Sequence, residues 1–423
     1  MKIILINYRY FISGGPERYM FNAKELLENK GHTVIPFSVK HNLNQKSDEK
    51  YFISSVGKGN ETYFSDYKFS SFKDFFKVLG RMFYSFEAKK KLIELIKAEK
   101  PDVIYCLHFQ NKISCSIISA ANKCKVPFVQ RISDYGQICP NRFLYNSKKN
   151  MICEKCVQGT LWHSVIDRCY GSATKSFIKM LSVWFQKFYG VRKKINAFCF
   201  TNQFAMQKYI EAGYPKEKCF LLPTFFNQNL ADKNLNISYE PFALYIGRLD
   251  REKGIETLLE AFLLNQKTLK IIGFSSERNY EDELKNMVAN KEHNIEFLGE
   301  MKFNEMQKTL AKCLFTIVPS EWYENLPNTI LESYAFSKCV IATNIGSLKD
   351  AVKEGETGLL FDRCNAENLA NRADYLFENE SEAVRMGERA RLEVEGVYGM
   401  EGHYGRLMDV FGACNQTIIG RRK

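Results

Sequence analysis

Short apolar runs alternate with helix-like patterns along the chain, and this alternation restricts the possible folds more than any other feature of the sequence. Six runs lie in the first half, at residues 2–7, 32–39, 102–107, 127–132, 197–201 and 218–222. Five follow in the second half, at residues 242–246, 269–272, 295–298, 314–318 and 339–342. Strands that alternate with helices form parallel sheets with helices on both faces. The sequence therefore predicts an α/β protein.

The length of the chain divides this pattern into two domains. A single hydrophobic core rarely grows beyond about 250–300 residues, and the chain has 423 residues. The polar segment 227–240 separates the two sets of strands and is the expected linker. We expect doubly wound, Rossmann-like domains at 1–226 and 227–400, and a final helix at 401–423 that returns to the first domain. Ligands of such sheets bind at the carboxyl ends of the strands, here in a central cleft.

Hydropathy and cysteine content indicate a cytoplasmic protein. No run approaches the ~18 apolar residues of a membrane-spanning helix, and residues 1–7 turn polar too soon for a signal peptide. We expect the protein in the cytoplasm or at the inner face of the membrane, with its 13 cysteines mostly reduced.

Charge is divided unevenly between the two halves of the chain. Residues 1–200 hold 33 Lys and Arg against 15 Asp and Glu, a formal charge of +18, whereas the whole chain carries +12. A basic first half attracts an anionic partner. The candidates are a membrane surface, a phosphorylated acceptor and nucleic acid.

Two glutamates lie eight residues apart in the segment 321–332. Glu324 is expected in a loop. Glu332 is expected in the helix that follows this loop, with Pro327 as the first helical residue. Carboxylates accept hydrogen bonds from sugar hydroxyls, and the helix N-terminus near Asn325 and Leu326 favours phosphate. The segment therefore predicts a site for a polyhydroxylated, phosphate-bearing ligand. The alternative is a pair of solvated helix glutamates.

Two further turns at strand ends suit a phosphate. In the turn 247–254, Arg248 can hold a phosphate with two parallel hydrogen bonds and Lys253 can add a point charge. After the first strand, Gly14 and Gly15 allow close approach of the backbone at the start of a helix. A solvated basic turn and an ordinary strand-to-helix turn are the respective alternatives.

Four cysteines with the spacing C-x13-C-x2-C-x12-C interrupt the first domain: Cys139, Cys153, Cys156 and Cys169. Four thiolates with one C-x2-C pair suit a tetrahedral structural zinc ion, and free or redox-labile cysteines are the alternative. His163 lies nearby, but we do not expect it to be a ligand. The remaining cysteines lie mostly on apolar runs and are expected in the core.

Two segments, 72–97 and 176–194, combine aromatic residues with lysines and arginines. Such helices either contact an anionic membrane or cover a sheet. His108 follows the strand 102–107, where a residue of the cleft would lie, although a lone histidine is often structural.

Taken together, these residues resemble glycosyltransferase family 4, the retaining enzymes with the GT-B fold. The similarity covers nearly the whole chain in order: residues 14–18, 247–254, Glu324 to Glu332, 346–347 and 357–360. The insert of about 139–170 is similar to a cysteine-containing subgroup of surface-polysaccharide glycosyltransferases. The resemblance implies two domains that face a cleft and a nucleotide-diphosphate sugar as donor.

The resemblance also assigns roles to single residues. It implies that Arg248 and Lys253 hold the donor diphosphate in place of a catalytic metal ion, so none is expected. Glu332 would hold the nucleotide ribose. The donor sugar would be held by Glu324 and the amides near Asn325 and Leu326, with Gly15 approaching from the other domain.

The chain departs from the family at one position. Many members carry a histidine immediately before the position of Asp134, where it contacts the transferred sugar, and this chain has Ser133. Either Ser133 or His108 takes this role, or the sugar specificity differs.

The resemblance implies transfer of a sugar, with retention, to a glycan or a lipid-linked acceptor, and no nucleic-acid partner. Two other functions are compatible with parts of the sequence. The basic first half and the cysteines also fit a zinc-stabilised nucleic-acid-binding protein. A nucleotide-sugar epimerase shares the two-domain architecture.

Overall fold

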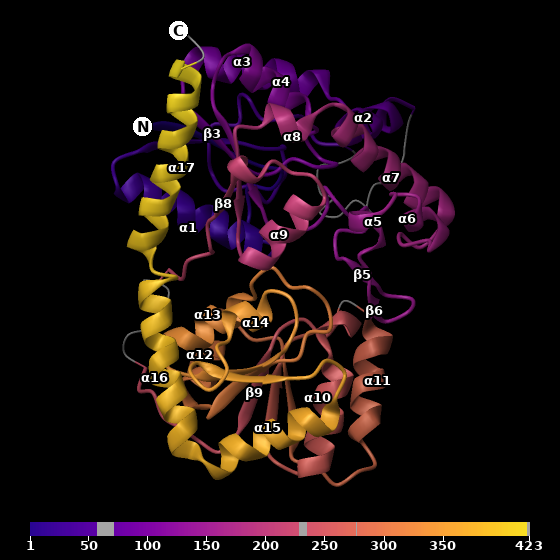
Figure 1. Cartoon of the computed structure of the whole chain (residues 1–423), viewed down its shortest axis with the longest axis vertical. Coiled ribbons are helices and arrows are strands. Elements are labelled where there is room, and N and C mark those ends of the chain that lie inside the picture. The colour runs from indigo at the N-terminus through magenta and orange to yellow at the C-terminus, as the bar shows by residue number, and fades with distance from the viewer. Residues whose placement is uncertain (57–71, 228–234, 276, 421–423) are drawn as a thin grey trace.

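The computed structural model describes residues 1–56, 72–227, 235–275 and 277–420. It shows two α/β domains stacked along the long axis of the molecule, with the helix α17 (Met400–Gly420) lying along the first domain (Figure 1). Each domain contains a six-stranded parallel sheet. The predicted fold class is therefore confirmed.

The first domain is built on a sheet with the order β2-β1-β3-β4-β7-β8. Its strands are β1 Lys2–Asn7, β2 Thr33–Phe37, β3 Val103–His108, β4 Phe128–Ile132, β7 Ala197–Phe200 and β8 Cys219–Leu221. All six correspond to predicted runs. The strand order reverses between β1 and β3, and ligands of doubly wound sheets bind at this switch point.

The helices of the first domain are α1 Gly15–Asn29, α2 Phe72–Met82, α3 Phe86–Glu99, α4 Ser116–Lys123, α5 Lys155–Gln158, α6 His163–Ile166, α7 Ala173–Phe188, α8 Val191–Lys194 and α9 Gln203–Glu211. A 3-10 turn, η2, covers Lys216–Lys218. A two-stranded antiparallel ribbon, β5 Tyr145–Asn146 and β6 Met151–Ile152, lies inside the cysteine insert and was not predicted.

Both faces of the first sheet are buried. Along β1, Ile4 and Ile6 point to the side covered by α3 and α4, whereas Ile3 and Leu5 point to the side covered by α1 and α17. Parallel strands buried on both faces form continuous apolar runs, which is why the sequence predicted these strands well.

The second domain has the strand order β11-β10-β9-β12-β13-β14. Its strands are β9 Ala243–Ile246, β10 Leu269–Ile272, β11 Ile295–Gly299, β12 Phe315–Val318, β13 Cys339–Thr343 and β14 Gly358–Phe361. Its helices are α10 Ile255–Asn265, α11 Arg278–Val288, α12 Phe303–Lys312, α13 Asn328–Ala335, α14 Leu348–Ala351, α15 Ala366–Glu378 and α16 Glu380–Gly396, with a 3-10 turn, η4, at Arg251–Lys253. The switch point lies between β9 and β12.

Two sequence-based expectations are corrected. β14 was missed, because it begins at Gly358, inside the turn expected at 355–358. The helix α13 begins at Asn328, since Pro327 has an extended ψ of 129° and caps the helix from outside. The segment 72–97 forms two helices, and α3 packs its apolar face against the sheet, which is one of the two alternatives expected for it.

The chain connects the two domains at two neighbouring points. The first is near Phe226, before the second domain, and the second is near Tyr398, between α16 and α17. The amide of Phe226 donates to the carbonyl oxygen of Tyr398 at 3.0 Å. After this point α17 packs Leu407 and Phe411 into the core of the first domain.

Candidate active site

The turn after β9 carries two cations with different surroundings. Arg248 is half-exposed and pairs with Asp250 and, at 3.8 Å, with Glu252. Lys253 is mostly buried, and its Nζ lies 2.5 Å from Oε1 of Glu324. The turn follows directly from a strand at the switch point, where a doubly wound sheet binds its ligands. The pair Lys253–Glu324 therefore joins two predicted site residues that are 71 positions apart.

The turn can form only because residue 254 is glycine. Gly254 has a left-handed backbone with φ of 70°, and a Cβ atom there would lie 2.0 Å from the carbonyl oxygen of Pro319. Any other residue would push this turn away from the loop after β12. The close packing places Lys253 beside Glu324.

Glu324 is held in one orientation by its neighbours. Besides Lys253, its Oε1 accepts hydrogen bonds from Ser320 Oγ at 2.8 Å and from Trp322 Nε1 at 3.0 Å. Its carbonyl oxygen accepts a bond from Ser347 Oγ at 2.7 Å. A carboxylate fixed by three donors on one oxygen is a preorganised acceptor for a sugar hydroxyl.

Glu332 lies on α13 and faces the first domain. Its carboxylate is 3.4 Å from Nη1 of Arg18, which projects from α1. Burial raises the pKa of Glu332 above its ordinary value, and the charge of Arg18 acts in the opposite direction. A largely buried carboxylate beside a single cation at the domain junction is available to accept hydrogen bonds from a bound ligand.

Asn325 connects the two domains. Its Nδ2 donates to the carbonyl oxygen of Ser133 at 2.5 Å, and its Oδ1 accepts from Thr201 Oγ1 at 3.4 Å. The side chain of Asn202 donates to its carbonyl oxygen. Leu326 follows and packs against the core of the second domain. Both residues precede Pro327, the cap of α13. They therefore lie just before the first turn of the helix, not within it.

Gly14 and Gly15 bring the start of α1 close to the second domain. A Cβ atom at Gly15 would lie 3.2 Å from Nδ2 of Asn328, the first residue of α13. Two helix N-termini thus approach each other across the junction. Their amide ends favour an anionic ligand.

His108 and Ser133 form one unit. Ser133 Oγ lies 2.9 Å from His108 Nε2, and the Oδ2 atom of Asp134 lies 3.5 Å from the same nitrogen. Burial raises the pKa of Asp134, but Arg142 and His108 outweigh it and hold the pKa below its ordinary value. These residues, predicted as alternatives to each other, are therefore in contact at the carboxyl ends of β3 and β4.

The sequence did not identify several residues that complete the site. Ser320 and Trp322 hold Glu324, Ser347 holds its backbone, and Arg18 holds Glu332. A signal existed only for Arg18, which belongs to the Gly-Gly-Pro-Glu-Arg motif. The others become recognisable only when the loops after β12 and β13 are placed side by side.

The cysteine insert contacts the loop that carries Glu324. The rings of Phe143 and Trp322 meet edge to face, with centroids 5.1 Å apart. Arg363 donates from Nη2 to the carbonyl oxygen of Asn150 at 2.8 Å and from Nε to that of Glu321. The insert therefore covers one side of the candidate site.

Inside the insert, one small cavity is lined by Cys139, Cys153, Cys156 and Cys169 together with His163 and Asp167. The thiol of Cys139 donates to Asn141 Oδ1 at 2.8 Å, and burial raises the pKa of Cys139 to about 11. Within the described ranges, no group of three or more His, Cys, Asp or Glu side chains is arranged so that it could hold a metal ion. The donor set fits zinc, whereas the arrangement is that of free thiols.

Three comparisons with known proteins bear on this geometry. Residues 227–393 match the family model "Glycosyl transferases group 1". A stretch of 150 residues is 32% identical to an uncharacterised glycosyltransferase of Methanocaldococcus jannaschii, covering 36% of this chain and 42% of the relative. A stretch of 207 residues is 24% identical to the capsular polysaccharide biosynthesis glycosyltransferase CapM of Staphylococcus aureus, covering 46% of this chain and 52% of the relative. The chain thus spans about half the length of these curated relatives.

A solved structure resembles the whole chain. The Anabaena protein HepE in complex with UDP-glucose superposes with a TM-score of 0.66 at 15% identity, covering 98% of this chain and 100% of that one. This similarity establishes the GT-B fold. The second domain matches the family model for glycosyl transferases group 1, and both curated relatives are named as glycosyltransferases. Neither alternative function receives support from these relatives.

In the part of the chain that the structure describes, no helix is long and apolar enough to cross a membrane.

Proposed function

We propose that the protein is a retaining glycosyltransferase that moves a sugar from a nucleotide-diphosphate sugar to a hydroxyl of a growing glycan or lipid-linked acceptor. The observation that carries this proposal is the contact between Lys253 and Glu324 at the switch point of the second sheet. Lys253 would meet the diphosphate, and the fixed carboxylate of Glu324 would meet the sugar. The HepE complex and the name of the CapM relative support a nucleotide-sugar donor and a glycan product.

Arg248 and Lys253 would stabilise the leaving group. Negative charge develops on the diphosphate as the glycosidic bond breaks, and preorganised cations lower the energy of that state. Arg248 is exposed enough to turn from Asp250 to a ligand, whereas Lys253 is already fixed. The two side chains supply the charge that a catalytic metal ion would otherwise supply.

The remaining predicted residues would position the donor and its sugar. Glu332 would accept hydrogen bonds from the ribose, and it is buried at the domain junction, which raises the pKa of its carboxyl. Glu324 would bind the donor sugar. His108 and Ser133, which share a hydrogen bond, would approach that sugar from the first domain, so both contribute to the role of the family histidine.

Retention of configuration would follow from attack on the face that the diphosphate leaves. The acceptor hydroxyl would approach from the first domain and lose its proton to the departing phosphate. No nucleophilic side chain is then required. Contact between the domains would exclude water and so limit hydrolysis of the donor.

The proposal is tested by thermal shift of the purified protein with UDP, GDP, ADP and their sugars. One nucleotide series should raise the melting temperature, and Arg248→Ala should abolish the rise. Arg251→Ala is the matched control, because Arg251 belongs to the same turn but pairs with Glu256 and Glu283 on the surface. Absence of a shift with every nucleotide, or an equal loss in both variants, would contradict the proposal.

We also propose that the insert binds a structural zinc ion through Cys139, Cys153, Cys156 and Cys169. Four thiols around one cavity support this assignment. Bound as thiolates, they would hold the insert against the loop of Glu324. Metal analysis of the purified protein should find one zinc per chain, and Cys153→Ser/Cys156→Ser should remove it; a zinc-free wild type would refute the site.

A further inference from the structure

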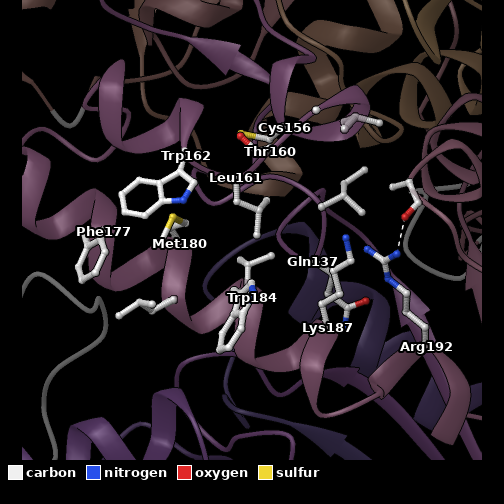
Figure 2. Close-up of a pocket in the computed structure, with 16 residues that line it drawn as sticks. Gln137, Cys156, Thr160, Leu161, Trp162, Phe177, Met180, Trp184, Lys187 and Arg192 are labelled. Carbon is white, nitrogen blue, oxygen red and sulfur yellow. Dashed lines mark hydrogen bonds between the residues drawn. The ribbon is translucent and has the colours of Figure 1, made fainter.

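A cavity of about 540 Å³ lies outside the candidate active site, between α7 and the segment 156–162. Its walls are mostly apolar, and they include Leu161, Trp162, Phe177, Met180, Val183 and Trp184. In Figure 2 the polar residues Gln137, Lys187 and Arg192 lie together, away from Trp162 and Phe177. The volume is in the range of small-molecule pockets, which are typically apolar with a few polar groups at defined places.

Large apolar side chains continue from the cavity onto the surface. Trp162 is 54% exposed, Trp184 52%, Ile166 73% and Phe188 76%. The rings of Trp184 and Phe188 are stacked, with centroids 5.5 Å apart. Two of the three tryptophans of the chain are therefore on this surface. A contiguous exposed patch of this kind marks a binding surface on soluble proteins, and tryptophan is enriched where a protein meets a membrane.

The same surface is strongly basic. From residue 168 to residue 210 the chain contains eight Lys and Arg and no Asp or Glu. Four of these cations, Lys175, Lys187, Lys193 and Lys194, have exposed side chains on α7 and α8. Exposed aromatic side chains beside exposed lysines complement an anionic lipid surface.

The cavity is also close to the candidate active site. Gln137 lines it and also lines the small cavity that contains His108 and Ser133. Its Nε2 donates to Gln130 Oε1 at 3.2 Å, and its Oε1 accepts from the hydroxyl of Tyr214 at 3.0 Å. The two cavities therefore share Gln137 as a lining residue.

We propose that the surface formed by α7, α8 and segment 156–162 docks on an anionic bilayer, and that the cavity takes the aliphatic chain of the phosphate-bearing lipid that carries the acceptor sugar. The lipid phosphate would meet the exposed lysines, and its sugar would extend past Gln137 toward Ser133. The role of this lipid as acceptor rests on the proposed function. The binding of the lipid does not.

Vesicle binding tests the docking surface. The full-length protein should co-sediment with phosphatidylglycerol vesicles and not with phosphatidylcholine vesicles, and salt should weaken the binding. Lys187→Glu/Lys193→Glu should lower the partition coefficient at least ~25-fold, since loss of each basic residue near an anionic surface costs about fivefold and the new carboxylates add repulsion. Lys308→Glu, an exposed lysine on α12 of the second domain, is the matched control and should bind like the wild type. Equal binding to neutral vesicles, or an equal loss in both variants, would refute the docking surface.

Farnesyl phosphate tests the cavity. It should change the fluorescence of Trp162 and Trp184, whereas inorganic phosphate should not. Leu161→Glu places a carboxylate among apolar walls and should weaken farnesyl phosphate binding at least tenfold, and a wild-type thermal shift with the nucleotide would show that this variant is folded. Leu392→Ser, which changes an exposed leucine on α16, is the control. No fluorescence response in the wild type, or unchanged affinity in Leu161→Glu, would refute the assignment.

The two proposals fail in different ways. A protein that binds nucleotide and transfers sugar to lipid-free acceptors, but binds neither vesicles nor farnesyl phosphate, refutes the lipid site alone. A protein that binds lipid and gives no shift with any nucleotide leaves the lipid site supported and refutes the glycosyltransferase function.

Discussion

The second domain fixes its site carboxylate, Glu324, with three donors, whereas in the first domain His108 and Ser133 are joined by one hydrogen bond. In the second domain, Glu324 is bonded to Ser320 and Trp322 in the same loop and to Lys253 in the adjacent turn. In the first domain, the unit of His108 and Ser133 depends on β3 and β4 lying side by side.

This difference separates a preorganised side from an adaptable side. The side of the site formed by the second domain is fixed by three donors on Glu324 and lies in the region that matches the group 1 family model. The side formed by the first domain carries the excess positive charge and the cysteine insert. We infer that the common chemistry of sugar transfer is located in the second domain and the choice of acceptor in the first.

Removing the fixed cation on the donor side should have the largest effect. Lys253→Ala should lower kcat/KM by about 10²–10³-fold, since loss of one preorganised group that stabilises transition-state charge has this cost. Lys253→Arg should retain part of the activity. Initial rates with the nucleotide sugar identified by thermal shift measure the effect. A change below about threefold would show that the critical charge lies elsewhere. It would also contradict the conclusion that the second domain holds the preorganised side of the site.

Changes in the His108–Ser133 unit should be smaller and should leave nucleotide binding intact. His108→Asn and Ser133→Ala should each lower kcat by about tenfold, as expected for a lost hydrogen bond to a reacting sugar. Because the two side chains are bonded to each other, the double variant should be little worse than either single one. The thermal shift with the free nucleotide should not change. Additive losses would show that the two residues act separately.

The smallest expected effect is on the pH dependence of stability. It arises from His403, which attaches α17 to the first domain. This side chain is fully buried, with Nε2 3.0 Å from the hydroxyl of Tyr19 and Nδ1 2.9 Å from the carbonyl oxygen of Pro223. Burial lowers the pKa of His403 from 6.5 to about 3, and Arg131 acts in the same direction. Between pH 6.5 and about 3, His403 is protonated in the unfolded state and neutral in the folded state. The free energy of unfolding is therefore highest above pH 6.5 and decreases as the pH falls below it.

Urea unfolding at neutral pH and near pH 5.5 measures this effect. The wild type should lose roughly 1.4 kcal/mol per pH unit below the ordinary histidine pKa. His403→Gln should show a smaller difference between the two conditions. His293→Gln, in the second domain, should keep the wild-type difference. Identical pH profiles for all three proteins would show that His403 does not contribute to this dependence.

Local sequence determined the elements well and the contacts between them poorly. The eleven predicted strands exist in the structure, and each lies on a short, largely apolar run. β14 begins at Gly358, inside a segment whose glycines predict a turn, and the start of α13 was misplaced because a proline fits both the first helical position and the cap.

Residue types at the strand ends also identified most of the candidate site. What could not be predicted is which of these residues touch. Arg18 and Glu332 are 314 positions apart, and Asn325 and Ser133 are 192 apart. These contacts depend on how the two domains stack, which no local pattern encodes. The same reason explains why His108 and Ser133 were expected as alternatives and not as partners.

The hydrogen bond between Phe226 and Tyr398 ties the two chain crossings together at one edge of the molecule. We infer that these two crossings, joined at one edge, form a hinge about which the domains could rotate. In Figure 1 the ribbon of β5 and β6 lies at the opposite edge, where Arg363 holds Asn150. Opening about this edge would be widest at the insert, and it would break the hydrogen bond from Arg363 to Asn150.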